Sequence, residues 1–345
     1  MTDGTLSDNV SGLGFGCGTW LAALFFFFHF FMSISASVRK VLPQNLKTLL
    51  RVIYTTKNWA EVLSVKFGLK KECVARFRNK QTTFGVNRSN WDSFMTYVDF
   101  FREVPDGEVV GDKIRVPYRG RDLFFSYGKW GVNCVTEMFR GEPYREFLQE
   151  FSIKDRVVVD IGANIGDSAI YFALWGAKKV YAFEPFPGWY RKAAENVKLN
   201  HLENVCEVFN AGVGGKSGFF MEDSTFQNLF AEDANMDRLL DGMEPAKKVP
   251  LLTLQEIAEK HDVRHAFLKV DCEGYEYDVL MHTPDEVLKR FDYVLVEFHY
   301  GLKDLVRKFT DAGFSVRHTK PEHTSDYPTK EGDERYVGYL VARLP

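Results

Sequence analysis

Short apolar runs alternate with amphipathic stretches from Arg156 onward, and this alternation constrains the fold more than any other feature of the 345-residue chain. The runs with the character of buried strands lie at 157–161, 179–184, 207–210, 266–271 and 293–298. Helical stretches follow them, at 167–173, 190–199, 253–261, 275–282 and 302–312. Such a pattern predicts a parallel sheet with helices on both faces. We expect 314–318 and 336–342 to close the sheet as a terminal pair of strands.

Polar residues gather where these strands end, and ligands of such sheets bind beyond the carboxyl ends of the strands. The segment DIGANIGD, residues 160–167, ends the first strand and begins the first helix. Gly162 and Gly166 would let a ligand approach the backbone, and the helix start offers free N–H groups. The segment is therefore a candidate binding loop.

The loop departs from a dinucleotide-binding loop, which would have G-x-G-x-x-G. Asn164 replaces the second glycine, and the third position is Asp167. Carboxylates at Asp160 and Asp167 would repel a pyrophosphate. They suit a ligand that carries a positive charge, such as the sulfonium of S-adenosylmethionine.

Two further strand ends fit the same ligand. Glu184 lies 22 residues beyond Gly162, where an acidic residue can accept both ribose hydroxyls. Asn210 and Ala211 close the third strand, and their backbone could frame an adenine edge. Together with the loop, these residues predict an S-adenosylmethionine site that comprises Asp160, Gly162, Asn164, Gly166, Asp167, Glu184, Asn210, Ala211 and Asp271.

Five motifs distinguish this half of the chain: DIGANIGD at Asp160, AFEP at Ala182, AENVKLN at Ala194, NAGVGG at Asn210 and LKVDCEGYEYDVL at Leu268. Over about residues 156–318 the chain resembles the FkbM family of S-adenosylmethionine-dependent methyltransferases. The resemblance implies a Rossmann-like class I methyltransferase sheet of seven strands with a terminal antiparallel hairpin. It also implies methyl transfer, commonly to a hydroxyl of a sugar or other natural product.

Methyl transfer is an in-line displacement, so alignment supplies most of the acceleration, and a hydroxyl acceptor needs a positioned base. Asp271 and Glu273 lie at the end of the fourth strand, and Glu297 and His299 at the end of the fifth. We place Asp271 beside the methionine moiety or the acceptor. His299 is the preferred base because its charge changes near neutral pH. Alternatively, Glu273 and Glu276 cap or pair within the following helix, and His299 satisfies a backbone group.

Metal and disulfide chemistry have weaker support. Asp271, Glu273 and Glu297 could together hold a divalent metal, but nothing in the motifs demands one, and no metal is predicted. The chain has 5 cysteines, far apart and without a C-x-x-C pair, which indicates neither a zinc site nor a disulfide framework.

Residues 9–38 contain no Lys, Arg, Asp or Glu, and this segment is long enough to span a bilayer. Arg39 and Lys40 follow it, which by the positive-inside bias would place the rest of the chain in the cytoplasm. Two other interpretations compete with an anchor at 1–38. In the first, the apolar segment is buried in the protein. In the second, translation starts at Met32 and the sequence before it has no role.

Residues 39–150 form the predicted N-terminal region, and the methyltransferase domain is expected over 151–345. Between Arg39 and Lys80 the chain has 11 basic residues and 2 acidic ones. The spacing of apolar residues in this region predicts two short amphipathic helices. The segment 113–128 resembles a hairpin.

Because the whole chain carries a net charge of −3, we expect no nucleic-acid partner. The expected acceptor is a small molecule, a sugar or a lipid-linked glycan at the cytoplasmic membrane face. The alternatives are a methyltransferase acting on RNA or protein, and a non-catalytic donor-binding module.

Overall fold

The computed structural model describes residues 43–126, 129–221, 248–323 and 336–345. The described chain divides into two compact units, one that ends at Arg102 and one that begins at Glu103. No helix within the described ranges is both long and apolar enough to cross a membrane. The segment proposed as an anchor, 9–38, lies outside the described residues.

The first unit is a small α+β structure. Its elements are α3 (Gln44–Thr55), α4 (Trp59–Lys66), the antiparallel strands β1 (Glu72–Arg76) and β2 (Thr83–Asn87), and α5 (Trp91–Glu103). Each helix buries apolar residues, such as Val52 in α3, Val62 in α4 and Phe94 in α5, and Phe77 is buried as well. The two predicted helices between 39 and 80 are therefore present.

The second unit begins with a three-stranded antiparallel sheet of β3 (Glu108–Val110), β4 (Lys113–Tyr118) and β5 (Arg121–Ser126). The predicted hairpin is confirmed. Its turn has positive φ at both Arg119 (49°) and Gly120 (76°), the conformation that matches the twist of hairpin strands. Helices α6 (Lys129–Thr136) and α7 (Arg145–Glu150) follow, joined by the π-helix η1 (Glu137–Gly141).

The central sheet has the strand order β14-β16-β13-β12-β6-β7-β8. Its strands are β6 (Val157–Ile161), β7 (Lys179–Phe183), β8 (Cys206–Phe209), β12 (Ala266–Val270), β13 (Phe291–Phe298), β14 (Ser315–His318) and β16 (Tyr336–Arg343). The pairs from β8 to β13 are parallel, whereas β16 runs antiparallel to both β13 and β14. This order confirms the predicted Rossmann-like sheet of seven strands with its antiparallel terminal pair. The short β15 (Glu322–His323) adds to one side of β16.

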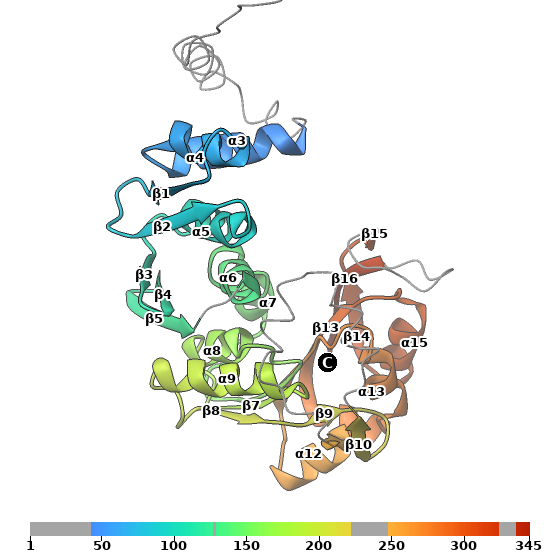
Figure 1. Cartoon of the computed structure of the whole chain (residues 1–345). Helices are drawn as coiled ribbons and strands as arrows, with labels where there is room; N and C mark the ends of the chain where they lie inside the picture. The colour runs from blue at the N-terminus through green and yellow to red at the C-terminus, as the bar shows by residue number, and fades with distance from the viewer. Residues whose placement is uncertain (1–42, 127–128, 222–247, 324–335) are drawn as a thin grey trace, which may run out of the picture. The chain divides into compact units, whose positions relative to one another are not determined.

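Helices cover both faces of this sheet (Figure 1). They are α8 (Asp167–Leu174), α9 (Pro187–Leu199), α12 (Leu254–Lys260), α13 (Glu276–His282), α14 (Asp285–Leu288) and α15 (Lys303–Asp311). Alternate strand residues such as Val159 and Leu268 pack in one core with residues of α12 to α15. On the opposite face the ring of Phe267 lies 5.5 Å from that of Phe172 in α8. Side chains of one strand thus alternate between two helical layers.

A second small sheet lies in the insertion before α12. It consists of β9 (Gly212–Val213), β10 (Gly218–Met221) and β11 (Lys248–Leu252), in the order β10-β11-β9. The sequence pattern did not predict these strands.

The boundary expected near residue 150 falls inside the second unit. The reason is a set of hydrogen bonds between β5 and α9. The side chain of Asn196 accepts from the Ser126 N–H (2.8 Å) and donates to the Ile165 carbonyl (2.9 Å). Asn200 similarly bonds both backbone groups of Phe124. The hairpin is therefore attached to the sheet domain by contacts far apart in sequence.

Asn196→Ala should lower the free energy of unfolding by about 2–4 kcal/mol, because it leaves a buried N–H and a buried carbonyl without partners. Urea denaturation of the purified protein measures this change. Gln255→Ala is the control, since it removes only an exposed contact to Glu259. Equal stability of the two variants would show that the hairpin is held by other contacts.

Candidate active site

The loop between β6 and α8 has a backbone shaped by close packing. Gly162 has a φ of 80°, and a Cβ on it would lie 1.7 Å from the carbonyl oxygen of Asp271. Gly166 has a φ of 82°, and a Cβ on it would lie 3.1 Å from the Cα of Ala193 in α9. Only glycine fits these positions, because both the conformation and the space exclude a side chain. We expected these glycines to make room for a ligand. In the structure they make room for neighbouring parts of the chain, at Asp271 and Ala193.

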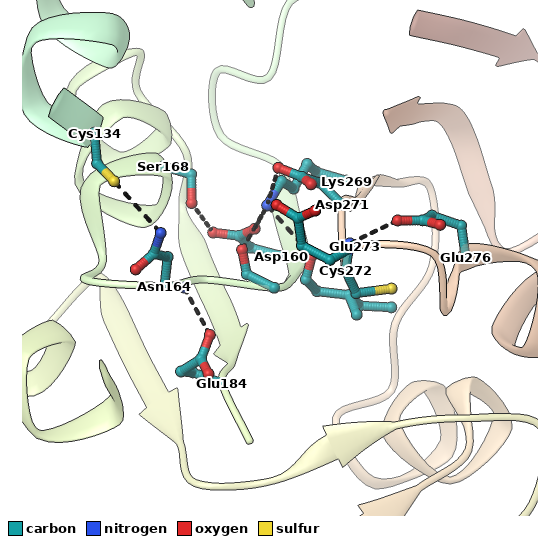
Figure 2. A network of polar contacts seen from close by, with 12 residues as sticks. Cys134, Asp160, Asn164, Ser168, Glu184, Lys269, Asp271, Cys272, Glu273 and Glu276 are labelled. Atoms are coloured by element: carbon teal, nitrogen blue, oxygen red, sulfur yellow. Dashed lines mark hydrogen bonds and ion pairs between the residues drawn. The ribbon is translucent and has the colours of Figure 1, made fainter. Parts of the chain in front are cut away.

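Asn164 occupies the middle of the loop in the left-handed region, with φ of 48°, which asparagine tolerates better than most residues. Its N–H donates to Oε2 of Glu184 (2.9 Å), and its side-chain amide donates to Sγ of Cys134 in α6 (3.5 Å). Figure 2 shows these contacts side by side. The loop is therefore held from β7 and from α6 together.

Glu184 follows β7 and is 5% exposed. Its second oxygen, Oε1, accepts from the Phe186 N–H at 2.9 Å. Burial raises the pKa of Glu184 to about 8, although two backbone hydrogen bonds lower it. Asn210, at the end of β8, donates to the carbonyls of Glu184 (3.1 Å) and Pro185 (2.9 Å). The structure thus brings the three predicted strand ends together.

Asp160 and Asp167 are both buried beneath the loop rather than presented to a ligand. Asp160 is 0% exposed and accepts from Oγ of Ser168 at 2.6 Å. Burial raises the pKa of Asp167 to about 7, against the lowering effect of the Lys269 charge. These carboxylates lie beneath the loop and affect the electrostatic potential there. Ala211, predicted with Asn210 to frame an adenine edge after β8, is buried as well.

Lys269, which sequence reasoning missed, lies at the centre of this network and is 2% exposed. Its Nζ lies 3.1 Å from Oδ1 of Asp160 and 3.4 Å from Oδ2 of Asp271. It also donates to the Gly162 carbonyl at 2.7 Å. The signal was present in the sequence, because a lysine inside the apolar run AFLKV must find anionic or carbonyl partners when the strand is buried.

The second loop, between β12 and α13, is organised by Glu276, which is 0% exposed. Its Oε1 accepts from the N–H groups of Cys272 (2.9 Å) and Gly274 (3.0 Å). Glu273 has a φ of 55°, an unfavourable value for its residue type. Strained backbone of this kind concentrates at functional sites, and here two such loops meet.

His299 has a different character from the neutral base that its residue type suggested. It is 4% exposed, with Nδ1 3.0 Å from Oε1 of Glu276 and Nε2 3.5 Å from Oε2 of Glu273. Burial lowers the pKa of His299, but the hydrogen bond and charge of Glu276 outweigh it and raise the value to about 9. At neutral pH His299 is therefore a cation paired with Glu276. In the alternative interpretation Glu276 caps or pairs within its own helix; in the structure it bonds His299 and the loop that precedes the helix.

Glu297 lies at the end of β13, next to Asp271 on the neighbouring strand. The register pairs Val270 with Val296, so the residues that follow them are neighbours. Burial and the negative charge of Asp271 raise the pKa of Glu297 to about 8. The structure thus confirms that Asp271 and Glu297 lie at adjacent strand ends.

Asp271, Glu276 and His299 are the one group of metal-ligand type among the described residues, with donor atoms within 4.8 Å of one another. Glu276 and His299 already bond each other, and Glu276 holds two backbone N–H groups. This group differs from the set considered in the sequence, which combined Asp271 with Glu273 and Glu297. These contacts fit an organised loop better than an ion site.

A family model described as "Methyltransferase FkbM domain" matches residues 160–316. "Methyltransferase 1" of Beauveria bassiana is 28% identical over 193 residues, which make up 49% of this chain and 76% of that protein. "Protein arginine N-methyltransferase 1" of Oryza sativa subsp. japonica is 33% identical over 110 residues, which make up 30% of this chain and 27% of that protein.

Among solved structures, the M. jannaschii tRNA m1G37 methyltransferase is similar with a TM-score of 0.37 and 15% identity, over 68% of this chain and 57% of that chain. A precorrin-6y C5,15-methyltransferase from Geobacter metallireducens is similar with a TM-score of 0.32 and 16% identity, over 59% of this chain and 88% of that chain.

The matched residues begin at Asp160 and end within β14, so they contain both loops, Lys269 and Glu297. The strand order agrees with the sheet that this family resemblance implied. Residues 160–316 thus match the FkbM methyltransferase domain in sequence.

Proposed function

We propose that this chain is an S-adenosylmethionine-dependent O-methyltransferase whose acceptor is a hydroxyl of a small molecule, a sugar or a lipid-linked glycan. One observation carries the proposal. Asp271 and Glu297 lie at adjacent strand ends beside the glycine loop, and the pKa of Glu297 is raised to about 8 by burial and by the charge of Asp271. A carboxylate of this pKa suits general-base work on a hydroxyl near neutral pH.

The residues at the strand ends fit S-adenosylmethionine. Each oxygen of Glu184 accepts one backbone N–H and keeps a second lone pair for a ribose hydroxyl. Oδ1 of Asn164 is buried without a hydrogen-bond partner, so the loop offers an unused acceptor. The bound donor supplies an electrophilic methyl group on a sulfonium. The excess of carboxylates around Lys269 favours that positive charge.

The protein's own residues then have three tasks in the reaction. Asp271, with 25% of its side chain exposed, is placed to orient the acceptor. Glu297 takes the proton of the acceptor hydroxyl as the oxygen attacks. His299, as a buried cation, holds Glu276 and through it the loop from Cys272 to Gly274. The base role expected for His299 therefore passes to Glu297, and His299 positions the loop.

The relatives include proteins named as arginine and tRNA methyltransferases, so acceptors of other classes need a direct comparison. The acidic residues beside Asp271, namely Glu273 and Glu297, disfavour a polyanionic acceptor such as RNA. A membrane anchor at 9–38 would place the site near lipid-linked glycans. Fractionation of the full-length chain tests that part separately.

Glu184→Ala should weaken the binding of S-adenosylmethionine by about ten-fold or more, because it removes the partner of the ribose hydroxyls, and a hydrogen bond left unmade at a buried site costs about 1–3 kcal/mol. Isothermal titration calorimetry measures the affinity. Glu195→Ala, which changes an exposed carboxylate on α9, is the matched control and should bind as wild type does. If Glu184→Ala also keeps wild-type affinity, Glu184 does not hold the ribose.

Methyl-labelled S-adenosylmethionine, incubated with the protein and fractionated cell extract, should transfer its label to a glycan or small-molecule hydroxyl. Glu297→Gln should lower this transfer by about 10²–10⁴-fold without a comparable loss of donor affinity. The wild-type rate should rise as pH approaches about 8, where Glu297 loses its proton, and Glu297→Gln should lack that rise.

Glu286→Gln, which alters an exposed carboxylate on α14, controls for a general change of charge in the transfer assay. Label that enters protein or RNA instead would reject a hydroxyl acceptor on a small molecule or glycan. Full activity of Glu297→Gln would reject Glu297 as the base.

The pairing of His299 with Glu276 makes stability depend on pH. The pKa of His299 is about 9 in the folded chain and about 6.5 in an unfolded one. The pair should therefore contribute fully below about pH 6.5, and the contribution, about 2–4 kcal/mol, should be lost as pH rises through 9. Urea denaturation between pH 6 and 10 should show this loss in wild type and a flatter profile in His299→Gln. Parallel profiles would show that the pair is not charged.

A further inference from the structure

We propose that Lys269 is a positioning residue that holds the glycine loop and Asp271 in one fixed arrangement, and thereby sets donor affinity. The effect on the donor rests on the proposed function. The effect on the loop does not. Lys269 is the last residue but one of β12, and its ammonium lies where β6 passes into the glycine loop (Figure 2).

The ammonium contacts four oxygens from three places. It lies 3.1 Å from Asp160 in β6 and 3.4 Å from Asp271 after β12. It donates to two carbonyls where β6 passes into the loop, those of Gly162 (2.7 Å) and Ile161 (3.3 Å). An ammonium has three N–H donors, so these four acceptors share them. A shift of one acceptor therefore changes the contacts of the others.

The ammonium stays charged in this environment. Burial lowers the pKa of Lys269, but the negative charges of Asp160 and Asp271 raise it above its usual value. A charged group that is 2% exposed needs compensation from fixed partners. The loop carbonyls and both carboxylates supply it, so their positions are coupled through one atom.

A purely structural role would not require this arrangement. Asp160 already accepts from Ser168, and a buried ion pair can often be replaced by apolar or neutral groups without loss of stability. The side chain of Asp271 is 25% exposed. Water can therefore solvate this carboxylate, and the fold does not need it to face the ammonium. The link from a fully buried lysine to the glycine loop and to a solvent-accessible carboxylate is what indicates positioning.

The single change Lys269→Met leaves Asp160 buried without its counter-ion, so the informative variant is the charge-matched pair Lys269→Met with Asp160→Asn. Asp160→Asn alone and Lys178→Met, an exposed lysine, are the controls. The first measurement is amide hydrogen exchange of residues 161–166 in the ligand-free protein. The second is calorimetric titration with S-adenosylmethionine.

The double variant should exchange the loop amides about ten-fold faster than Asp160→Asn, and bind the donor about ten-fold more weakly. Thermal denaturation shows that the variant is folded. Wild-type exchange and wild-type donor affinity in the double variant would overturn the proposal, because Lys269 would then only neutralise Asp160.

Asp271→Asn tests the same link from its exposed end, where misfolding is not expected. Faster exchange of residues 161–166 in this variant supports the coupling, and unchanged exchange contradicts it. If the wild-type chain binds no S-adenosylmethionine, the proposed function fails. The exchange measurements still decide whether Lys269 positions the loop.

Discussion

The contact between the Lys269 ammonium and Asp160 is the interaction on which the candidate site depends. Both residues lie in the middle of the sheet, on paired positions of β12 and β6, and both side chains are almost completely buried. A charge pair at this depth is stable only when further polar groups surround it. Those groups are the carbonyls at the start of the glycine loop, Ser168 at the start of α8, and Asp271.

Two loops meet above this pair, and their packing leaves little freedom. The Asp271 carbonyl lies where a side chain on Gly162 would be, so the ends of β6 and β12 approach each other as closely as glycine permits. The second loop is held from below by Glu276 and His299. In the proposed function, such rigid strand ends would orient a donor and an acceptor without a large rearrangement, which is what an in-line displacement needs.

The carboxylates at the site have different characters because their surroundings differ. Asp160 is neutralised by Lys269, and Glu276 is paired with His299. Among the described residues Glu297 forms no ion pair, and the pKa of Glu297 is raised to about 8 by burial and by the charge of Asp271. Environment, rather than residue type, thus distinguishes the paired carboxylates Asp160 and Glu276 from Glu297, which we propose as the base.

The sequence by itself determined the sheet, its helices and the loops at the strand ends, because hydrophobic period and glycine position are local signals. It also placed Asp271 and Glu297 at neighbouring strand ends, since parallel strands end at one edge. The outcomes that depend on distant partners were beyond it. The pairing of His299 with Glu276 and the attachment of the hairpin through Asn196 required the tertiary structure. So did the burial of Asp160 against Lys269. The pKa of each of these groups depends on the groups that the fold brings into contact with it, and those contacts join residues far apart in the sequence.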